Sequence, residues 1–260
     1  MNLEKSEKRR KHIVGEAEKC GLEYEVVKAV EGAKLSPEDL DELCDMDKVR
    51  EFPEWLSPGM IGASLSHRKV YNKIIENGEE MALVLEDDAI LPVFLPQILD
   101  DISAQVKQNE VVLIYYSSFT TLEFSTCNSV PLANKTRLMY PMFLQGVGGG
   151  VCYVVTQDAA KSLYDGLLPI AYSPDSWRDF IEAGFLKSLR CVYPVVADHL
   201  GVKSTIDATN QGFLRREITE LVDKYEVPFL QKKLQSMRRS SLLSRSNYSL
   251  TDDRSPLDVD

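Results

Sequence analysis

The feature that most constrains the fold is the segment 81–91, MALVLEDDAIL, in which a continuous apolar run ends in three consecutive acids, Glu86, Asp87 and Asp88. An apolar run of this length is typical of a buried strand in an α/β sheet. Ligands of open α/β sheets bind beyond the carboxyl ends of the strands. The segment therefore predicts an α/β fold that brings carboxylates to a ligand site.

Strand alternation gives the three acids different directions. Glu86 and Asp88 are expected on one face, roughly 6–7 Å apart at Cα, with Asp87 pointing the opposite way. That pair can share one hard cation, and a ligand set made only of oxygens favours Mg²⁺ or Mn²⁺. Such a cation favours a phosphate-bearing substrate, which completes its coordination shell. An acidic turn that caps the next segment is the alternative interpretation, because short motifs often match by chance.

The composition fits one folded α/β domain with a tail and excludes several classes of protein. With 260 residues, 44% of them hydrophobic, the chain can bury a sizeable core. A formal net charge of −10 argues against a general nucleic-acid binder, which needs a basic face. No apolar run approaches the ~18 residues needed to span a bilayer. Residues 1–14 are charged from the outset, so no signal peptide is expected and the predicted location is cytoplasmic.

The cysteines do not predict a metal or disulfide framework. They are widely spaced and form neither a CxxC nor a CxxH pair, so reduced thiols are expected. The five are Cys20, Cys44, Cys127, Cys152 and Cys191.

Helical and strand patterns alternate along the chain, as expected of an α/β sheet. Residues 117–140 are polar and poorly periodic, which favours a hairpin or long loop near the site. The predicted helices include 4–21, 59–78 and 157–167, and the predicted strands include 25–30, 111–116 and 191–196. Residues 146–156 predict a glycine hinge that runs into a strand. Beyond these the composition turns polar, which predicts a catalytic domain over 1–230 and a flexible polar tail over 231–260.

Four blocks, in order, carry a resemblance to a known family. They are NLEKSEKRR with KAVEGAKLS behind it, GMIGASLSHRKVYNKII, ALVLEDDAIL, and GGVCYVVTQDAAKSL with SPDSW. Over residues 2–206 they resemble glycosyltransferase family 25, the bacterial lipopolysaccharide and lipooligosaccharide galactosyltransferases. The resemblance implies a GT-A-like fold, a Rossmann-type mixed sheet flanked by helices. It also implies an apolar opening strand ahead of Asn2, which is clipped in this sequence.

The chemistry implied by the resemblance is inverting transfer of a hexose, commonly galactose, from a UDP-sugar. The implied acceptor is a lipopolysaccharide, a lipooligosaccharide or a related surface glycan or glycolipid. The segment Glu86, Asp87 and Asp88 would be the counterpart of the DXD element that binds the donor. Asp88 would ligate Mn²⁺ or Mg²⁺, and Glu86 would face the ribose, or the metal through water.

Three more residues are implied at the donor site. Arg9 matches a basic position where a guanidinium can pair with the diphosphate, although within KSEKRRK it fits a solvated helix face equally well. Ser66 and His67 belong to the LSH triplet of the second block. A lone histidine on the apolar face of a helix is more often a hydrogen-bonded structural residue, and the same alternative holds for Ser66.

The acceptor side needs a base that is not a metal ligand. Inverting transfer is a single displacement, in which a carboxylate takes the proton of the acceptor hydroxyl. Asp175, in the SPDSW turn, is the first candidate. Asp179, one helical turn later, and Asp198, after the last strand, remain open as alternatives.

Other residues of the same blocks are candidates for acceptor binding. Trp177 would suit stacking on a sugar face, but a tryptophan in a short amphipathic helix also fits the core. The glycines Gly148, Gly149 and Gly150 could let the chain pass close to the acceptor sugar, or they form only a turn.

Two other functions stay open from the sequence. One is a catalytically impaired sugar- or nucleotide-binding protein of the same fold. The other is a metal-dependent phosphohydrolase, which would need more ligands than the acids and the three histidines readily supply. Peripheral contact with the cytoplasmic face of the inner membrane is a further expectation, with a solubilising tail as its alternative. It depends on Lys232, Lys233, Arg238, Arg239, Arg245, Leu242 and Leu243.

Overall fold

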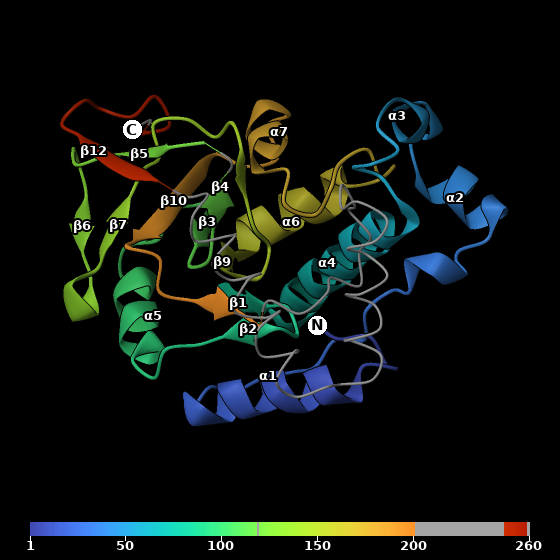
Figure 1. The fold of residues 1–260 in the computed structure, drawn as a ribbon, viewed down its shortest axis with the longest axis horizontal. Coiled ribbons are helices and arrows are strands. Elements are labelled where there is room, and N and C mark those ends of the chain that lie inside the picture. Colours follow the sequence, from blue (N-terminus) through green and yellow to red (C-terminus); the bar gives the residue numbers. More distant parts are fainter. Residues whose placement is uncertain (119, 201–246, 259–260) are drawn as a thin grey trace, which may run out of the picture.

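The computed structural model describes residues 1–118, 120–200 and 247–258, and it is built around one mixed β-sheet of six strands (Figure 1). The strand order is β1-β9-β3-β10-β7-β6. β3 and β10 are parallel, and the other neighbours are antiparallel. The bounds are β1 Met81–Leu85, β3 Glu110–Leu113, β6 Val130–Pro131, β7 Arg137–Met139, β9 Cys152–Thr156 and β10 Ser188–Tyr193.

Helices cover both faces of this sheet because its central strands are apolar on both sides. Val111 of β3 packs into one core with α4 and α6, whereas Val112 packs into the other with α1 and α5. Figure 1 shows α4 and α6 side by side, with α1 apart from them. The bounds are α1 Glu7–Lys19, α4 Pro58–Asn77, α5 Leu95–Ser103 and α6 Gln157–Gly166. The predicted α/β class, with a mixed sheet flanked by helices, is confirmed.

The helix predicted over 59–78 is α4. Ser57 caps its first turn by accepting the Met60 N–H at 3.4 Å, and Pro58 occupies the first helical position. Gly78 ends it with φ of 70°, a conformation that suits glycine. Within the helix, Gly62 allows η1 (Gly32–Lys34) to pack backbone to backbone, because a Cβ there would lie 2.6 Å from the Gly32 nitrogen.

Three short ladders and several small helices complete the described part of the chain. The ladders join β2 to β11, β4 to β8, and β5 to β12. Their bounds are β2 Ala89–Ile90, β4 Ser117–Ser118, β5 Leu122–Ser125, β8 Val147–Gly148, β11 Asp198–His199 and β12 Tyr248–Thr251. The helices are α2 Pro37–Leu43, α3 Met46–Glu51, α7 Trp177–Glu182 and η2 Ala133–Lys135. The segment 117–140, expected to be a hairpin or long loop, contains four short strands, of which β6 and β7 pair as an antiparallel hairpin. The expected strand at 25–30 is reduced to one bridge between Asn2 and Lys28.

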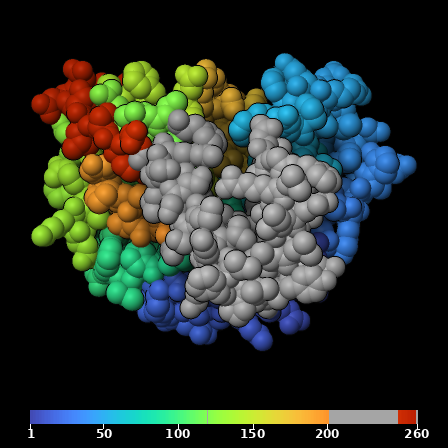
Figure 2. All heavy atoms as spheres, in the orientation of Figure 1, coloured from blue at the N-terminus to red at the C-terminus, as the bar shows by residue number. Residues whose placement is uncertain are grey.

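The last described residues differ from the predicted flexible tail. β12 runs parallel to β5, and Ser255 donates to the Pro141 carbonyl at 2.7 Å. Asp258 accepts the Asn128 amide at 2.6 Å. Figure 2 shows these residues, in red, seated beside the green segment that carries β5. The polar sequence concealed this element because its ladder is made by backbone groups.

The basic residues on which the expected membrane contact depends, Lys232 to Arg245, lie outside the described residues, as does the predicted domain boundary at 230. In the parts of the chain that the structure describes, no helix has both the length and the apolar character needed to cross a membrane.

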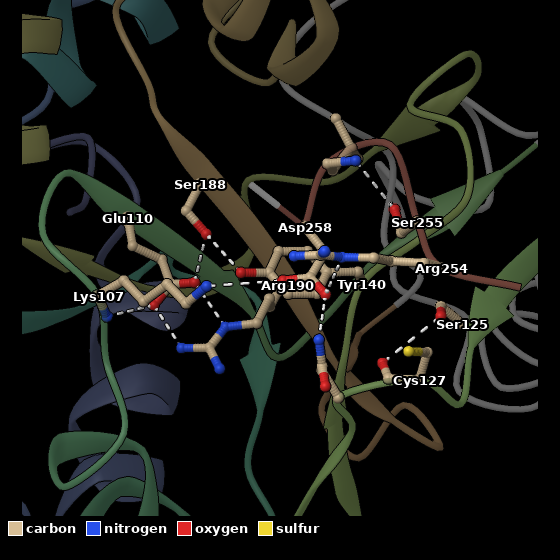
Figure 3. Close-up of polar contacts among 12 residues, drawn as sticks. Lys107, Glu110, Ser125, Cys127, Tyr140, Ser188, Arg190, Arg254, Ser255 and Asp258 are labelled. Carbon is tan, nitrogen blue, oxygen red and sulfur yellow. Dashed lines mark hydrogen bonds and ion pairs between the residues drawn. The ribbon is translucent and has the colours of Figure 1, made fainter. Parts of the chain in front are cut away.

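A buried ion pair joins the starts of β3 and β10 (Figure 3). Arg190 binds Glu110 through two hydrogen bonds, Nε to Oε1 at 2.6 Å and Nη2 to Oε2 at 2.7 Å. Ser188 donates to Oε1 at 2.8 Å, and the Lys107 N–H donates to Oε2 at 2.7 Å. Arg190 also donates to the Gln105 carbonyl at 2.7 Å. Both Glu110 oxygens are thus fully engaged in a structural network.

Candidate active site

The three acids lie on a turn directly after β1. The strand ends at Leu85, the Glu86 N–H still bonds to the Val151 carbonyl at 2.9 Å, and the Ala89 N–H turns back to the Glu86 carbonyl at 3.3 Å. The acids therefore lie outside the strand, and the alternating side-chain directions expected for them do not apply. The prediction that Asp87 points away from Asp88 is wrong, because one guanidinium contacts both carboxylates.

That guanidinium belongs to Arg9 on α1. Its Nη2 lies 2.7 Å from Asp87 Oδ1 and 2.8 Å from Asp88 Oδ2. Asn2 donates to the second Asp87 oxygen at 2.7 Å. Arg9 therefore does not lie on a solvated helix face, and its side chain is only 18% exposed. Its Nε and the Asp88 Oδ1 are buried and have no hydrogen-bond partner among the described residues.

The charges of the turn are closely coupled. The pKa of Asp88 is raised to about 6, first by burial and then by the negative charge of Glu86, with Arg9 acting in the opposite direction. Burial also raises the pKa of Asp87, against the effects of Arg9 and Asn2. The turn therefore holds more negative charge than Arg9 alone balances.

Glu86 lies beside His67 of α4. The His67 Nε2 lies 3.7 Å from Glu86 Oε1, and no hydrogen-bond partner within the described residues satisfies this buried nitrogen. Burial alone would raise the pKa of Glu86, but His67 and Arg9 outweigh it and hold the pKa below its usual value. His67 is fully buried.

Two tyrosines that the sequence analysis missed fix the His67 ring. Tyr153 of β9 lies 2.8 Å from His67 Nδ1, and Tyr71 lies 2.9 Å from the Tyr153 hydroxyl. If Tyr71 donates to Tyr153 and Tyr153 donates to Nδ1, the ring proton lies on Nε2, on the side of Glu86. The signal for Tyr71 was its spacing of four residues from His67, which puts both on one helix face.

Ser66 and Trp177 have structural roles and correct two predicted site residues. Ser66 is buried, donates to the Gly62 carbonyl at 2.6 Å and accepts the Val30 N–H at 2.8 Å, which leaves it no donor-binding face. Trp177 is 0% exposed and packs edge-on against Tyr153, with its indole N–H donating to the Gly149 carbonyl at 3.3 Å. Stacking on a sugar is therefore excluded for Trp177 as it lies here.

Asp175 is held against the glycine segment. Its Oδ2 accepts the Gly149 N–H at 2.8 Å, and its Oδ1 has a long contact of 3.4 Å with the Ser173 hydroxyl. The pKa of Asp175 is raised, chiefly by burial and also by Glu86, while the Gly149 N–H opposes the rise. A carboxylate with a raised pKa and one loosely bound oxygen can accept a proton near neutral pH.

The glycine segment lies between Asp175 and Glu86. A Cβ on Gly148 would lie 3.2 Å from Asp175 Oδ2, and a Cβ on Gly150 would lie 3.1 Å from Glu86 Oε1. Gly149 has φ of 120°, and a Cβ there would meet the Tyr115 ring at 3.0 Å. Gly148 and Gly150 therefore leave room for the Asp175 and Glu86 carboxylates to lie close against this segment.

The other two candidate bases lie in different surroundings. Asp198 pairs with Ile90 across the β11–β2 ladder, and the following Leu200 N–H bonds to the Asp88 carbonyl at 2.9 Å. Asp198 is thus on the side of the acidic turn. Asp179 lies on α7, and the described contacts of the acidic turn do not include it.

The acidic turn has an unpaired carboxylate oxygen that could bind one divalent cation. A cation would engage the unpartnered Asp88 Oδ1 and relieve the repulsion between Glu86 and Asp88. Within residues 1–118, 120–200 and 247–258, no group of three or more His, Cys, Asp or Glu side chains lies close enough to hold a metal. A cation here would therefore have at most two carboxylate ligands from the protein. This suits an ion such as Mg²⁺, which keeps water and substrate phosphates as further ligands.

Comparisons with known proteins identify the family of the chain. The chain matches a glycosyltransferase 25 family member from Aedes aegypti with 33% identity over 113 residues, covering 39% of this chain and 18% of that protein. It matches procollagen galactosyltransferase 1 from Danio rerio with 24% identity over 119 residues, covering 43% and 19%. The matches thus span about a fifth of the length of these relatives. The family model described as glycosyltransferase family 25 (LPS biosynthesis protein) matches residues 1–177, more than half of the chain, which therefore belongs to glycosyltransferase family 25.

Proposed function

We propose that this chain transfers a hexose from a UDP-sugar to a hydroxyl group of a glycan or glycolipid, with inversion at the sugar carbon. One observation carries the proposal. Among the described residues, the buried side-chain atoms without a hydrogen-bond partner are Arg9 Nε, His67 Nε2 and Asp88 Oδ1, and all three belong to the acidic turn and its neighbours. Buried polar groups are almost always satisfied in a folded protein, so such a cluster indicates a ligand site.

The donor would bind at the acidic turn. Arg9 Nε is a charged N–H donor suited to a diphosphate oxygen, and Asp88 Oδ1 is an acceptor suited to a cation. Asp88 and Glu86 would hold Mn²⁺ or Mg²⁺, which would neutralise the negative charge on the leaving diphosphate. The remaining contacts of Arg9, to Asp87 and Asp88, would keep the guanidinium oriented while the donor binds.

The acceptor would bind on the other side of the glycine segment. There Asp175 would take the proton of the acceptor hydroxyl as the oxygen attacks the sugar carbon. The bond from that carbon to the diphosphate oxygen breaks, and the electron pair leaves with UDP. Asp175 is preferred over Asp198 because Asp198 lies beside Asp88, on the side of the leaving group.

The sugar and the acceptor are proposed from the names of related proteins. The Danio rerio relative is called a procollagen galactosyltransferase, which supports galactose as the hexose. The description of the family model names LPS biosynthesis, which supports a lipopolysaccharide, a lipooligosaccharide or a related surface glycan as the acceptor. A cytoplasmic site of action, with peripheral contact at the inner membrane, is proposed with this acceptor.

Release of UDP tests the proposal. The protein is incubated with UDP-galactose, UDP-glucose or UDP-GlcNAc, with and without Mn²⁺, and UDP is measured over time. The expected result is release from UDP-galactose that disappears with EDTA and in Asp88→Asn. Asp47→Asn is the matched control, because this exposed carboxylate on α3 takes no part in the site.

The same assay separates the alternative functions. Binding of a nucleotide sugar without turnover would indicate a catalytically impaired binding protein. Release of inorganic phosphate from simple phosphate esters would indicate a phosphohydrolase. Failure to bind any nucleotide sugar would contradict the proposal.

A further inference from the structure

Tyr115 lies at the same edge of the main sheet as the acidic turn, although no sequence pattern singled it out. It follows β3, where the N–H groups of Ile114 and Tyr115 share the Cys152 carbonyl at 3.1 and 2.9 Å. β1 and β3 are both antiparallel to β9, so their carboxyl ends lie at one edge. Because ligands of α/β sheets bind beyond such ends, Tyr115 is placed where a ligand of the acidic turn would bind.

The glycine segment brings Tyr115 between the two halves of the candidate site. The outer two glycines of this segment lie against Asp175 on one side and Glu86 on the other. The middle one, Gly149, lies against Tyr115: a Cβ there would be 3.0 Å from Cδ1 and 3.1 Å from Cε1 of the ring. Along the segment, the neighbouring side chains are therefore those of Asp175, then Tyr115, then Glu86.

Packing on a second side fixes the Tyr115 ring. His199 of β11 lies edge-on to it, with 5.4 Å between the ring centroids and an angle of 82° between the ring planes. β11 pairs with β2, the strand that directly follows the acidic turn. The ring is thus held between the glycine segment and this ladder. A side chain that is already held in place loses little conformational freedom when a ligand binds to it.

The Tyr115 hydroxyl is a neutral hydrogen-bonding group beside the acidic turn. Burial raises the pKa of Tyr115, against the effect of a hydrogen bond with Ser117, so the phenol keeps its proton near neutral pH. Three carboxylates raise the pKa further through their negative charges, those of Asp198, Asp88 and Glu86. The hydroxyl can therefore donate a hydrogen bond to a ligand oxygen or accept one from a ligand hydroxyl.

The proposed function requires the transferred hexose to lie beside this tyrosine. The diphosphate of the donor would bind at the acidic turn. The acceptor oxygen, activated by Asp175, would attack the sugar carbon from the side opposite the diphosphate. The hexose would therefore lie between the acidic turn and Asp175, along the glycine segment, where Tyr115 is the side chain next to Gly149.

We propose that Tyr115 binds the hexose of the donor through a hydrogen bond between its hydroxyl and one hydroxyl of the sugar. This inference rests on the proposed function and adds to it a residue that discriminates among sugars. Ser117 would keep the Tyr115 hydroxyl oriented while the sugar binds. A site built to pair with a substrate hydroxyl rejects an analogue that lacks it, because the group on the protein is then left unpaired.

Tyr115→Phe tests the proposal because it removes only the hydroxyl. The kcat/KM for UDP release from UDP-galactose with Mn²⁺ is expected to fall at least about 10-fold. The Kd of UDP, which has no hexose, is expected to change less than about 2-fold. Tyr116→Phe is the matched control, because the Tyr116 hydroxyl donates to the Val192 carbonyl at 3.1 Å in the core on the other face of the sheet. It is expected to leave both constants unchanged.

Deoxy analogues of UDP-galactose, each lacking one hydroxyl of the hexose, identify the contact. The kcat/KM of each analogue is measured for the natural protein and for Tyr115→Phe. For the analogue that lacks the contacted hydroxyl, the two proteins are expected to differ by less than about 2-fold, because either deletion removes the same hydrogen bond. For the other analogues, the difference of at least about 10-fold is expected to persist.

The outcomes separate this inference from the proposed function. If the natural protein releases UDP and Tyr115→Phe has the same kcat/KM, the role of Tyr115 is overturned and the proposed function stands. An equal loss in Tyr115→Phe for every analogue, or an equal loss in Tyr116→Phe, would also overturn it, because the effect would then not come from one sugar hydroxyl. If the natural protein neither binds UDP nor releases it from UDP-galactose, the proposed function fails, and the role of Tyr115 fails with it.

Discussion

Two clusters of buried charge lie at opposite ends of the main sheet, and they differ in how completely their hydrogen bonds are made. Glu110 and Arg190 lie at the starts of β3 and β10, and both oxygens of Glu110 are bonded (Figure 3). Arg9 and Asp88 lie just beyond the end of β1, which runs parallel to β3, and each keeps one buried atom without a partner among the described residues.

This difference separates a structural cluster from a candidate binding site. Burial of charge costs free energy that only complete pairing offsets. The Glu110 cluster meets that requirement within the protein. The Asp88 cluster does not, and the pKa of Asp88 is raised to about 6, first by burial and then by the negative charge of Glu86. A ligand with both a cation and a diphosphate would complete it.

The largest expected effect is on catalysis, through the carboxylate across the glycine segment. Asp175→Asn keeps the hydrogen bond to Gly149 but cannot accept a proton, so kcat is expected to fall by about 10²–10⁴-fold. The measurement is the steady-state rate of UDP release with an acceptor. Asp165→Asn, an exposed change on α6, is the control. If Asp175→Asn has normal kcat and Asp179→Asn or Asp198→Asn shows a comparable loss of kcat, the base is that other aspartate and not Asp175.

The second effect is on stability, at the other end of the sheet. Glu110→Gln removes the charge that balances Arg190, and the free energy of unfolding is expected to fall by about 3 kcal/mol or more. Urea unfolding at pH 7 measures it. Replacing both residues by leucine should recover most of the loss, because no charge then stays buried alone. Loss of UDP binding in folded Glu110→Gln protein would mean that the two clusters are not independent.

The third effect is the pH dependence of stability at the acidic turn. Because the folded-state pKa of Asp88 lies above its ordinary value of 3.8, the folded protein holds this proton more tightly. The resulting stabilisation is present below about pH 4 and is lost as the pH rises through about 6.

Asp88→Asn cannot lose that stabilisation. Its advantage over the natural protein should therefore grow between pH 4 and 7 to on the order of 2 kcal/mol. Unfolding curves of both proteins across this range test the expectation. A stability difference that does not change with pH would show that folding does not raise the pKa of Asp88.

The smallest effect is expected at the tyrosines behind His67. Tyr153→Phe leaves Tyr71 and His67 Nδ1 without their shared partner, which is expected to cost about 1 kcal/mol of stability. The loss of a fixed ring orientation is expected to lower kcat more than it raises KM. Tyr140→Phe is the matched control, because the Tyr140 hydroxyl lies 3.4 Å from the Ser188 hydroxyl in the Glu110 cluster, and it should leave kcat unchanged. Equal kcat values in the two variants would show that Tyr153, through His67, does not help to position Glu86.

The sequence predicted the parts of the fold that depend on local patterns. The helix expected at 59–78 is α4, because its apolar periodicity and its terminal glycine are local signals. The strands expected at 111–116 and 191–196 overlap β3 and β10. The apolar run that ends in acids is β1, and its acids lie at the end of a strand as predicted. The roles assigned to the acids remain predictions.

The sequence did not predict features made by contacts between distant residues. Arg9 and Asp88 are far apart in the chain, as are His67 and Tyr153, and no local pattern records either contact. Trp177 was a candidate for sugar stacking because amphipathic spacing does not distinguish a core face from a ligand face. β12 was missed because backbone pairing with β5 outweighs a polar composition.

Titration of UDP into the protein tests the central claim most directly. Calorimetry at pH 7.5 is run with and without Mn²⁺ on the natural protein, on Asp88→Asn and on Tyr140→Phe. The expected result is Mn²⁺-dependent binding to the natural protein and to Tyr140→Phe, weakened at least about 10-fold in Asp88→Asn, a change of about 1.4 kcal/mol. Binding that is equally tight in Asp88→Asn, or no UDP binding to the natural protein with Mn²⁺ or Mg²⁺, would contradict the assignment of the acidic turn as the donor site.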